Sequence, residues 1–365
     1  MKPSKYSRLS LEERRRYLRE YANLTDEELS QIDPSGGLSL ESADHMIENV
    51  VGVISVPMAI VPGLTVNGKD YYVPLVTEQK RTITMAKIGL ELAQEAGGFT
   101  VESTRQIMIG QIQLVEIPDY DAAYVRVMDG KEELLKLANT QSRSRKAVDL
   151  QMRRFNTAVG TMAVVELLVD VRDSMGANVV DSMVETIAPS IQELTGGSVK
   201  LRILSNLATK RTVTVKVKVS PDSIDEKTAS DIVEAYAFAH ADPYRAATHN
   251  KGIMNGVASV LLATSNDTRA VEAGAHAYAA VTGRYVPLSK WSIDEEGGLE
   301  GELTMPMALG IIGGSIATHP TSKLALKILG VESAAELGMI TASIGLACNL
   351  GALYTLVTEG ITSIS

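Results

Sequence analysis

The spacing of hydrophobic residues divides the chain into three stretches, with borders near residues 105 and 220. In the middle stretch, apolar and polar residues alternate over several segments, as they do in half-buried strands. Two further segments, 121–139 and 179–194, repeat apolar residues every three to four positions, which predicts helices. The strand-like segments are 106–117, 160–171, 200–204 and 213–219. The resulting order of strand, helix, strand, helix, strand, strand predicts a compact α+β domain.

Helix-start signals mark the beginning of the chain. Ser10 with Glu13 and Thr25 with Glu28 have the spacing of capping boxes, which predicts two short helices. A third helix is predicted from residue 41 to near Val53.

A hairpin and a long helix follow. Asn67-Gly68 lies between two runs rich in β-branched and aromatic residues, which is a strong signal for a two-residue hairpin turn. Residues 82–95 are predicted to be helical. After Pro221 the chain returns to alanine-rich and glycine-rich helical sequence, so we expect a large, helix-rich, discontinuous domain with the α+β domain inserted. The expected bounds are 1–104 and 221–365 for the large domain and 105–220 for the insert.

Residues 339–357 carry no formal charge and approach the length of about 20 residues that spans a bilayer. The same stretch contains two glycines and several polar residues, which suits a helix packed on all sides within a protein core. These polar residues are Thr341, Ser343, Asn349 and Thr355. We therefore favour a buried central helix over a membrane span.

Composition limits the classes of protein to which the chain can belong. Its 365 residues suffice for two domains with sizeable cores. The net charge of −9 disfavours nucleic acid or an anionic membrane as a partner, because both attract proteins rich in Lys and Arg. The one cysteine, Cys348, excludes an internal disulfide framework and a thiolate cluster, and no metal site is expected. The amino-terminal residues have no apolar signal core, so we expect a cytoplasmic protein.

The strongest chemical signal is the motif Asp242-Pro-Tyr-Arg-Ala-Ala-Thr-His-Asn-Lys-Gly-Ile-Met-Asn-Gly256, which is followed by Asn266-Asp267. A lysine ammonium near a developing alkoxide stabilises it electrostatically, and a nearby carboxylate keeps the ammonium charged and oriented. Lys251 and Asp267 fit these two roles. The alternative is that they form a structural ion pair.

This motif resembles the hydroxymethylglutaryl-CoA (HMG-CoA) reductases, in particular the shorter soluble class of bacteria and archaea. The resemblance runs from about Ser7 to about Gly360, and the other similar stretches are 46–52, 170–178, 202–208 and 271–278. It implies that the insert is a ferredoxin-like nicotinamide-binding domain. It also implies the family reaction of the mevalonate pathway to isoprenoids, in which two hydrides from nicotinamide reduce HMG-CoA to mevalonate and CoA.

By this resemblance, Lys251 occupies the family's catalytic lysine position and Asp267 its aspartate position. Residues 73–81 align with a family pattern in which two acidic residues precede Pro-Ser, so Gln79 stands at the position of the catalytic glutamate. An amide hydrogen-bonds a carbonyl group but cannot deliver a proton. Glu78 is adjacent, and it substitutes only if the backbone shifts register. We therefore expect a slow reaction or an altered substrate.

The carboxyl-terminal residues Thr358-Glu-Gly-Ile-Thr-Ser-Ile-Ser365 end where the family continues with a Gly-His-Met segment and a mobile flap. We therefore expect the thiolate-protonating histidine and the flap domain to be absent. None of the histidines His249, His276 and His319 lies at the family's catalytic position, and we interpret each as structural.

For the cofactor, the resemblance implies contacts from Asp173, Met175, Gly176 and Asn178, because glycine there lets the backbone approach the dinucleotide closely. NAD-specific relatives carry an aspartate at the position aligned with Ser142. Here Ser142, Arg143 and Arg145 are suited to hold a 2′-phosphate, because guanidinium groups match phosphate geometry. We expect NADPH in preference to NADH, and the alternative is a solvated basic loop.

For the substrate, Arg245, Asn206 and Asn255 match family positions near the carboxylate or hydroxyl group of the acyl-CoA, and arginine offers a bidentate fork to a carboxylate. Residues 48–52 resemble a segment of the family's dimer contact, which implies a homodimer. Two functions remain open. One is a nicotinamide-dependent acyl-CoA reductase, and the other is a non-catalytic homologue that binds an acyl-CoA or a second subunit supplying the missing glutamate or flap.

Overall fold

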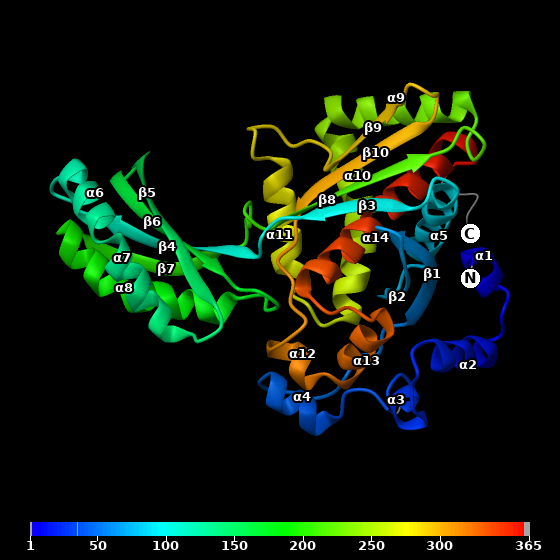
Figure 1. Ribbon diagram of the computed structural model, residues 1–365, viewed down its shortest axis with the longest axis horizontal. Coiled ribbons are helices and arrows are strands. Elements are labelled where there is room, and N and C mark those ends of the chain that lie inside the picture. Colours follow the sequence, from blue (N-terminus) through cyan, green and yellow to red (C-terminus); the bar gives the residue numbers. More distant parts are fainter. Residues whose placement is uncertain (1, 35, 361–365) are drawn as a thin grey trace. The chain divides into compact units, whose positions relative to one another are not determined.

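The computed structural model describes residues 2–34 and 36–360, and the chain divides into two compact units (Figure 1). The large unit consists of Met1–Ser103 and Thr212–Ser365, and the small unit is Thr104–Arg211. The chain therefore returns to the large unit after residue 211, whereas the sequence placed this border at residue 220. The expected absence of a carboxyl-terminal flap concerns sequence after Gly360, which lies outside the described residues.

Six strands form the sheet of the large unit, in the order β2-β1-β3-β8-β10-β9. Their bounds are Met58–Val66 (β1), Lys69–Val76 (β2), Phe99–Ser103 (β3), Thr212–Val219 (β8), Ser289–Ile293 (β9) and Leu299–Pro306 (β10). The hairpin predicted at Asn67-Gly68 is confirmed, because β1 and β2 pair antiparallel across these two residues. Both residues have positive φ, at 50° and 80°, as a tight hairpin turn requires.

Strand β8 corrects the assignment of 213–219 to the insert. It pairs antiparallel with β3 on one side and with β10 on the other, both in the large unit. Its alternate residues Val213, Val215, Val217 and Val219 are buried in the core of the large unit. The alternating pattern identified a strand correctly, but it carried no information about which sheet the strand joins.

Helices account for most of the remaining large unit. They are Pro3–Ser7 (α1), Leu11–Tyr21 (α2), Asp26–Ser30 (α3), Leu40–Met46 (α4), Lys80–Gln94 (α5), Glu226–Ala241 (α9), Pro243–Ala263 (α10), Thr268–Ala279 (α11), Gly314–Thr318 (α12), Pro320–Leu329 (α13) and Ala334–Thr358 (α14). Both predicted capping boxes are present: Ser10 Oγ accepts from the Glu13 amide at 3.2 Å, and Thr25 Oγ1 accepts from the Glu28 amide at 3.1 Å.

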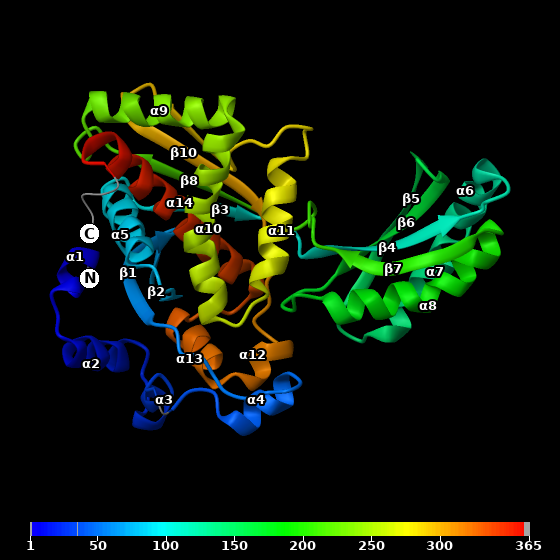
Figure 2. The same ribbon diagram turned by 180° about the vertical axis from the view of Figure 1, so that it is seen from behind.

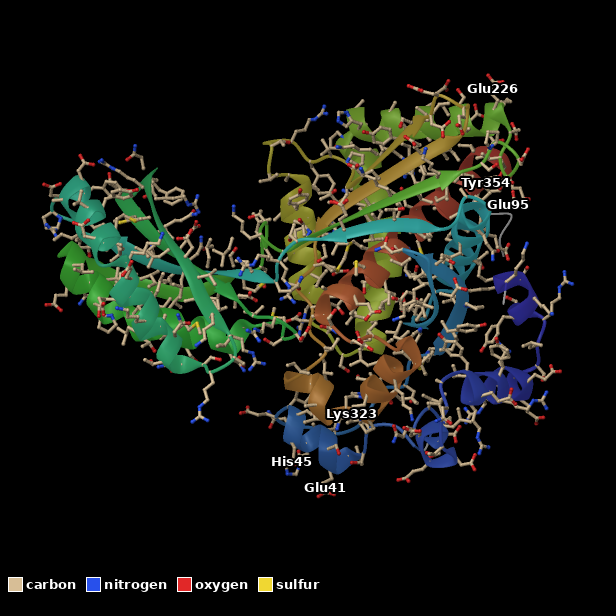
Figure 3. The ribbon with its side chains drawn as sticks, in the orientation of Figure 1. Glu41, His45, Glu95, Glu226, Lys323 and Tyr354 are labelled. Carbon is tan, nitrogen blue, oxygen red and sulfur yellow. The ribbon has the colours of Figure 1, made fainter. Side chains whose placement is uncertain are left out.

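The helix predicted to extend to Val53 instead ends at Met46, where α4 stops. Ile47 has extended backbone angles and Asn49 has a φ of 61°, so the helix cannot continue. On α4 itself, Glu41 and His45 are exposed and point outward (Figure 3). The following segment carries a run of exposed aliphatic side chains, which are Ile47, Val51, Val53, Ile54 and Val56.

Helix α14 is the central helix of the large unit, and it packs against α5 and α10 (Figure 2). It has the length and composition of a membrane span, yet 78% of its most apolar 18-residue window is buried inside the protein. Glycines explain how closely it packs. A Cβ at Gly89 on α5 would lie 2.0 Å from the Ala347 carbonyl oxygen, and one at Gly351 would lie 2.1 Å from that of Met85. The glycines thus serve helix packing, and the polar residues of this stretch are buried, as the sequence indicated.

The small unit has the strand and helix order of a ferredoxin-like fold. Its four strands form an antiparallel sheet in the order β5-β6-β4-β7. Their bounds are Ile107–Val115 (β4), Lys146–Thr157 (β5), Gly160–Asp170 (β6) and Ser198–Ser205 (β7), and the helices are Tyr120–Asp129 (α6), Lys131–Ala138 (α7), Asn139–Gln141 (a 3-10 turn) and Ala177–Thr195 (α8). The mixed α+β class with a ferredoxin-like insert is therefore confirmed.

Two details of the small unit differ from the sequence prediction. The helix predicted over 121–139 is divided at Gly130 into α6 and α7. Strand β5 was not predicted, because a register shift between Ala147 and Asp149 interrupts its alternation and its second half is exposed. A strand with such a bulge shows no continuous period of two in its sequence.

Candidate active site

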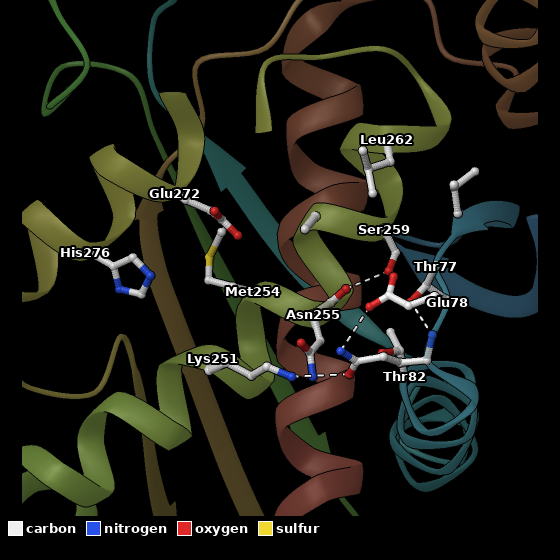
Figure 4. Close-up of a pocket in the computed structure, with 13 residues that line it drawn as sticks. Thr77, Glu78, Thr82, Lys251, Met254, Asn255, Ser259, Leu262, Glu272 and His276 are labelled. Carbon is white, nitrogen blue, oxygen red and sulfur yellow. Dashed lines mark hydrogen bonds between the residues drawn. The ribbon is translucent and has the colours of Figure 1, made fainter. Parts of the chain in front are cut away.

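A cavity of about 190 Å³ opens in the large unit between the end of β2, the start of α5, and helices α10 and α11 (Figure 4). Its lining residues are Val76, Thr77, Glu78, Gln79, Thr82, Lys251, Met254, Asn255, Ala258, Ser259, Leu262, Glu272 and His276. Lys251 is the one Lys or Arg side chain among these described residues. The cavity therefore joins the unusual 77–81 segment to the long motif that the sequence singled out.

Helix α10 presents one face to the cavity. Asp242 caps its first turn by accepting from the amides of Tyr244 and Arg245 at 3.2 and 3.3 Å, and Pro243 at the first helical position favours helix initiation there. Lys251 and Asn255 follow at a spacing of four residues, which places them on the same side of a helix. Both side chains line the cavity.

Gln79 contacts the lysine directly. Lys251 Nζ donates to Gln79 Oε1 at 3.2 Å, and Gln79 Nε2 donates to Glu78 Oε1 at 3.1 Å (Figure 4). Gln79 precedes the first residue of α5, and its side chain does not cap that helix. Its amide is therefore available to orient the ammonium group, whereas the carboxylate of Glu78 reaches the lysine only through Gln79.

Asp267 is at the start of α11. It is the N-cap of α11, and its carboxylate accepts from the Ala270 amide at 3.0 Å. It is exposed and does not line the cavity, and the described residues contain no ion pair between it and Lys251. The catalytic role that the sequence assigned to Asp267 therefore stays a prediction.

Two titratable groups in the cavity were missed or interpreted differently from sequence. Glu272 and His276 follow Asp267 on α11, and they line the cavity on one helical face because they are four residues apart (Figure 4). The Tyr285 hydroxyl lies 2.8 Å from His276 Nδ1 and orients the ring. The sequence treated His276 as structural. The sequence did contain a signal that Glu272 and His276 share a site: they are four residues apart in the helical segment that follows Asp267.

His249 is buried in the core, which is consistent with a structural role. Its Nε2 lies 2.6 Å from Ser289 Oγ and 3.2 Å from Asn349 Nδ2. Burial, together with the charge of Arg245, lowers the pKa of His249 to about 3, so the ring is neutral at physiological pH. Arg245 itself is half-buried, and burial lowers its pKa.

The three predicted substrate residues do not all lie at the cavity. Asn255 lines it. Arg245 does not line it; this residue precedes Lys251 by six positions on α10, or about 9 Å along the helix axis. Asn206 is an exposed residue of the small unit.

The predicted cofactor residues surround the start of α8 in the small unit. Gly176 is its N-cap with a φ of 100°, and a Cβ there would lie 2.5 Å from Val171 Cγ1, so only glycine fits. The first turn has no acidic residue, and no side chain caps it. An uncapped helix amino terminus offers N–H donors to an anion, so the residues present fit a dinucleotide phosphate.

The basic segment lies between the 3-10 turn and β5. Ser142 Oγ accepts from the Arg145 amide at 3.0 Å, which fixes the local turn. Arg143 is exposed and Arg145 is half-buried. Among the described residues neither guanidinium forms an ion pair, so both are compatible with an added phosphate.

The protein is an α+β protein of two units with a ferredoxin-like insert and a cavity that contains a lysine. Comparison with known proteins shows the family to which it belongs. The family model for hydroxymethylglutaryl-coenzyme A reductase matches residues 10–363. A 3-hydroxy-3-methylglutaryl-coenzyme A reductase of Archaeoglobus fulgidus is 44% identical over 362 residues, which cover 98% of this chain and 83% of that protein. The chain belongs to the HMG-CoA reductase family.

Solved structures agree with this assignment. A class II 3-hydroxy-3-methylglutaryl-CoA reductase of Streptococcus pneumoniae, solved with NADPH in open conformations, superposes with a TM-score of 0.94 at 39% identity. The match covers 98% of this chain and 100% of that one. A second structure of the Streptococcus pneumoniae reductase also has a TM-score of 0.94, and it covers 99% of this chain and 88% of that one.

Proposed function

We propose that this protein reduces the thioester of HMG-CoA, or of a closely related acyl-CoA, with NADPH. The contact between Lys251 Nζ and Gln79 Oε1 at the cavity wall carries the proposal, because it presents an oriented ammonium group to a developing oxyanion. Family membership and the NADPH-bound Streptococcus pneumoniae relative support the reaction and the cofactor. The proposal places the reaction in the cytoplasm.

Each residue has a defined part in this reaction. The nicotinamide, when bound, supplies hydride to the carbonyl carbon. Lys251 stabilises the negative charge that develops on the carbonyl oxygen, and Asn255 offers a further hydrogen bond from the same face of α10. Gln79 orients Lys251 but has no acidic proton to give. Proton transfer to the oxyanion is therefore the slow step in this chain.

Gln79 also supports a second candidate function, that of an accessory subunit that binds acyl-CoA. If the amide serves only to hold Lys251, the protein binds acyl-CoA without reducing it and acts as an accessory subunit beside a partner that supplies a carboxylic acid. Oxidation of NADPH by the purified protein with HMG-CoA, alone and with the products of neighbouring genes, decides between the two functions. Turnover by the protein alone would exclude the accessory function.

The proposal includes a homodimer. Residues 47–56 expose five aliphatic side chains on a segment without helix or strand, and the resemblance assigned part of this segment to a dimer contact. Contiguous exposed apolar side chains mark sites of protein association more often than free surface. A second copy of the chain is the partner that this segment fits.

We expect the protein to bind NADPH more tightly than NADH, by about tenfold or more, because Arg143 and Arg145 add charged hydrogen bonds to a 2′-phosphate. Fluorescence titration with both cofactors measures the preference. Replacing both arginines by alanine should remove it. Arg154→Ala is the matched control, because this arginine of β5 lies over the Tyr120 ring in the same unit. Equal affinities in the parent protein would identify the basic segment as a solvated loop.

Arg245→Ala should weaken the binding of HMG-CoA by about 1.5 to 3 kcal/mol, the contribution of a hydrogen bond to a charged group. The half-buried guanidinium is expected to pair with the carboxylate of the acyl group. Calorimetry measures the loss, and Arg284→Ala removes the same charge from an exposed site of the same unit as a control. An unchanged dissociation constant for Arg245→Ala would remove this residue from the substrate site.

A further inference from the structure

The small unit contains a buried arginine that the proposed reaction does not use. Arg211 is 1% exposed and belongs to the largest fully buried side chains of the protein. Its Nε donates to Gln106 Oε1 at 2.7 Å, and its Nη1 donates to the carbonyl oxygens of Ser174 and Met175 at 3.2 and 3.1 Å. The guanidinium thus binds the two carbonyl groups directly before Gly176.

A buried guanidinium is costly, and this cost indicates a role beyond general stability. Burial lowers the pKa of Arg211 to about 10, while the nearby Asp173 and Asp170 carboxylates favour the charged form. Buried charges contribute little net stability compared with apolar side chains of similar volume. The presence of this buried arginine is better explained by its contacts, which hold the backbone directly before α8 in place.

The segment 171–176 depends on this fixing. Ser174 Oγ and the Ser174 amide both donate to the Val171 carbonyl oxygen, at 2.9 and 3.2 Å. Gly176 then turns with a φ of 100° so tightly that a Cβ would collide with Val171. Without the guanidinium, the carbonyl groups of Ser174 and Met175 would lose these donors, and the turn would lose two of its restraints.

Arg211 also stands where the chain leaves the small unit. The chain enters the small unit at Thr104 and leaves it at Arg211, and we call these two points the chain crossings. At the first crossing, Thr104 and Gln106 belong to the same hydrogen-bond network as Arg211. Thr104 Oγ1 donates to the Lys210 carbonyl oxygen at 3.2 Å, and the Val171 amide donates to the Gln106 carbonyl oxygen at 2.9 Å. Both crossings and the segment 171–176 are therefore held by one set of hydrogen bonds.

We propose that Arg211 is a positioning residue for the dinucleotide: it holds segment 171–176 so that the uncapped N–H groups of α8 face the cofactor phosphate, and it ties this segment to both chain crossings. The inference rests on the proposed NADPH function. Arg211 itself does not touch the cofactor in this role, since its side chain is buried and donates to Gln106, Ser174 and Met175.

The test compares Arg211→Met and Arg211→Lys with the control Arg105→Met. Arg105 lies at the same crossing, but its side chain is 71% exposed and pairs with Asp170 at 3.2 Å. Arg211→Met should weaken NADPH binding on the order of 10-fold to 100-fold, the range that covers the loss of a charged hydrogen bond. Arg211→Lys should recover part of this loss because the ammonium still reaches one carbonyl group. Arg105→Met should bind NADPH as the parent does.

Two further readouts separate positioning from unfolding. Amide hydrogen exchange should accelerate in residues 171–180 of Arg211→Met and not in β4 or β6, while calorimetry should show unchanged HMG-CoA binding. Equal NADPH affinity of Arg211→Met and the parent overturns the inference. Exchange that accelerates throughout the small unit also overturns it, because the role would then be structural only. Failure of the parent itself to bind NADPH is a distinct result, which refutes the proposed function and the inference resting on it.

Discussion

Replacing Lys251 by methionine should lower kcat for carbonyl reduction by about 100-fold to 1,000-fold, the loss that follows removal of one preorganised oxyanion donor. Lys251 is the one Lys or Arg side chain among the described cavity residues, and Gln79 holds its ammonium at 3.2 Å. Methionine keeps the length and apolar stem of the side chain and removes the charge. Steady-state rates with HMG-CoA and with the free aldehyde measure the effect.

Lys290→Met is the matched control, because this lysine lies on β9 of the same unit and is 74% exposed beside Glu302. Lys251→Met and Lys290→Met should also be compared in a Gln79→Glu background. The expected faster reaction of that background makes a larger fall in rate measurable. NADPH affinity should stay unchanged in both variants. A Lys251→Met protein that turns over at the parent rate would show that the oxyanion is stabilised by another group.

Gln79→Glu should raise the rate of aldehyde reduction by about 100-fold to 10,000-fold, the usual contribution of a positioned general acid. The substitution is nearly isosteric and places a carboxyl group where Gln79 Oε1 now accepts from Lys251. Glu78 stays beside it, so the variant has two carboxyl groups at this end of the cavity. The gain for the thioester should be smaller, since that substrate also needs a proton for the departing thiolate.

The double variant Glu78→Gln with Gln79→Glu isolates the contribution of the neighbouring carboxylate. It should retain most of the gain if residue 79 is the acid, and it should lose the gain if Glu78 delivers the proton. A parent protein that already reduces the thioester at several turnovers per second, a common enzyme rate, would contradict the assignment of Gln79. The proton would then come from another cavity residue, for which Glu78, Glu272 and His276 are the candidates.

Several features of this protein follow from its sequence alone because they depend on neighbouring residues. The capping boxes at Ser10 and Thr25 need partners three residues away, and the turn at Asn67-Gly68 needs only positive φ at two positions. The shared face of Lys251 and Asn255 follows from the helical period. Local propensity and local hydrogen bonds are sufficient to determine such features.

Other features were decided by contacts between distant segments. The alternation of Val213 to Val219 fixed a strand, but its pairing with β3 and β10 placed it in the large sheet rather than in the insert. The sequence assigned Asp267 a role beside Lys251, whereas only the tertiary structure shows that Glu272 and His276 of α11 line the cavity and that Asp267 is the exposed N-cap of this helix. Strand pairing and helix packing join residues far apart in sequence. A local pattern does not specify which strand or helix a segment will contact.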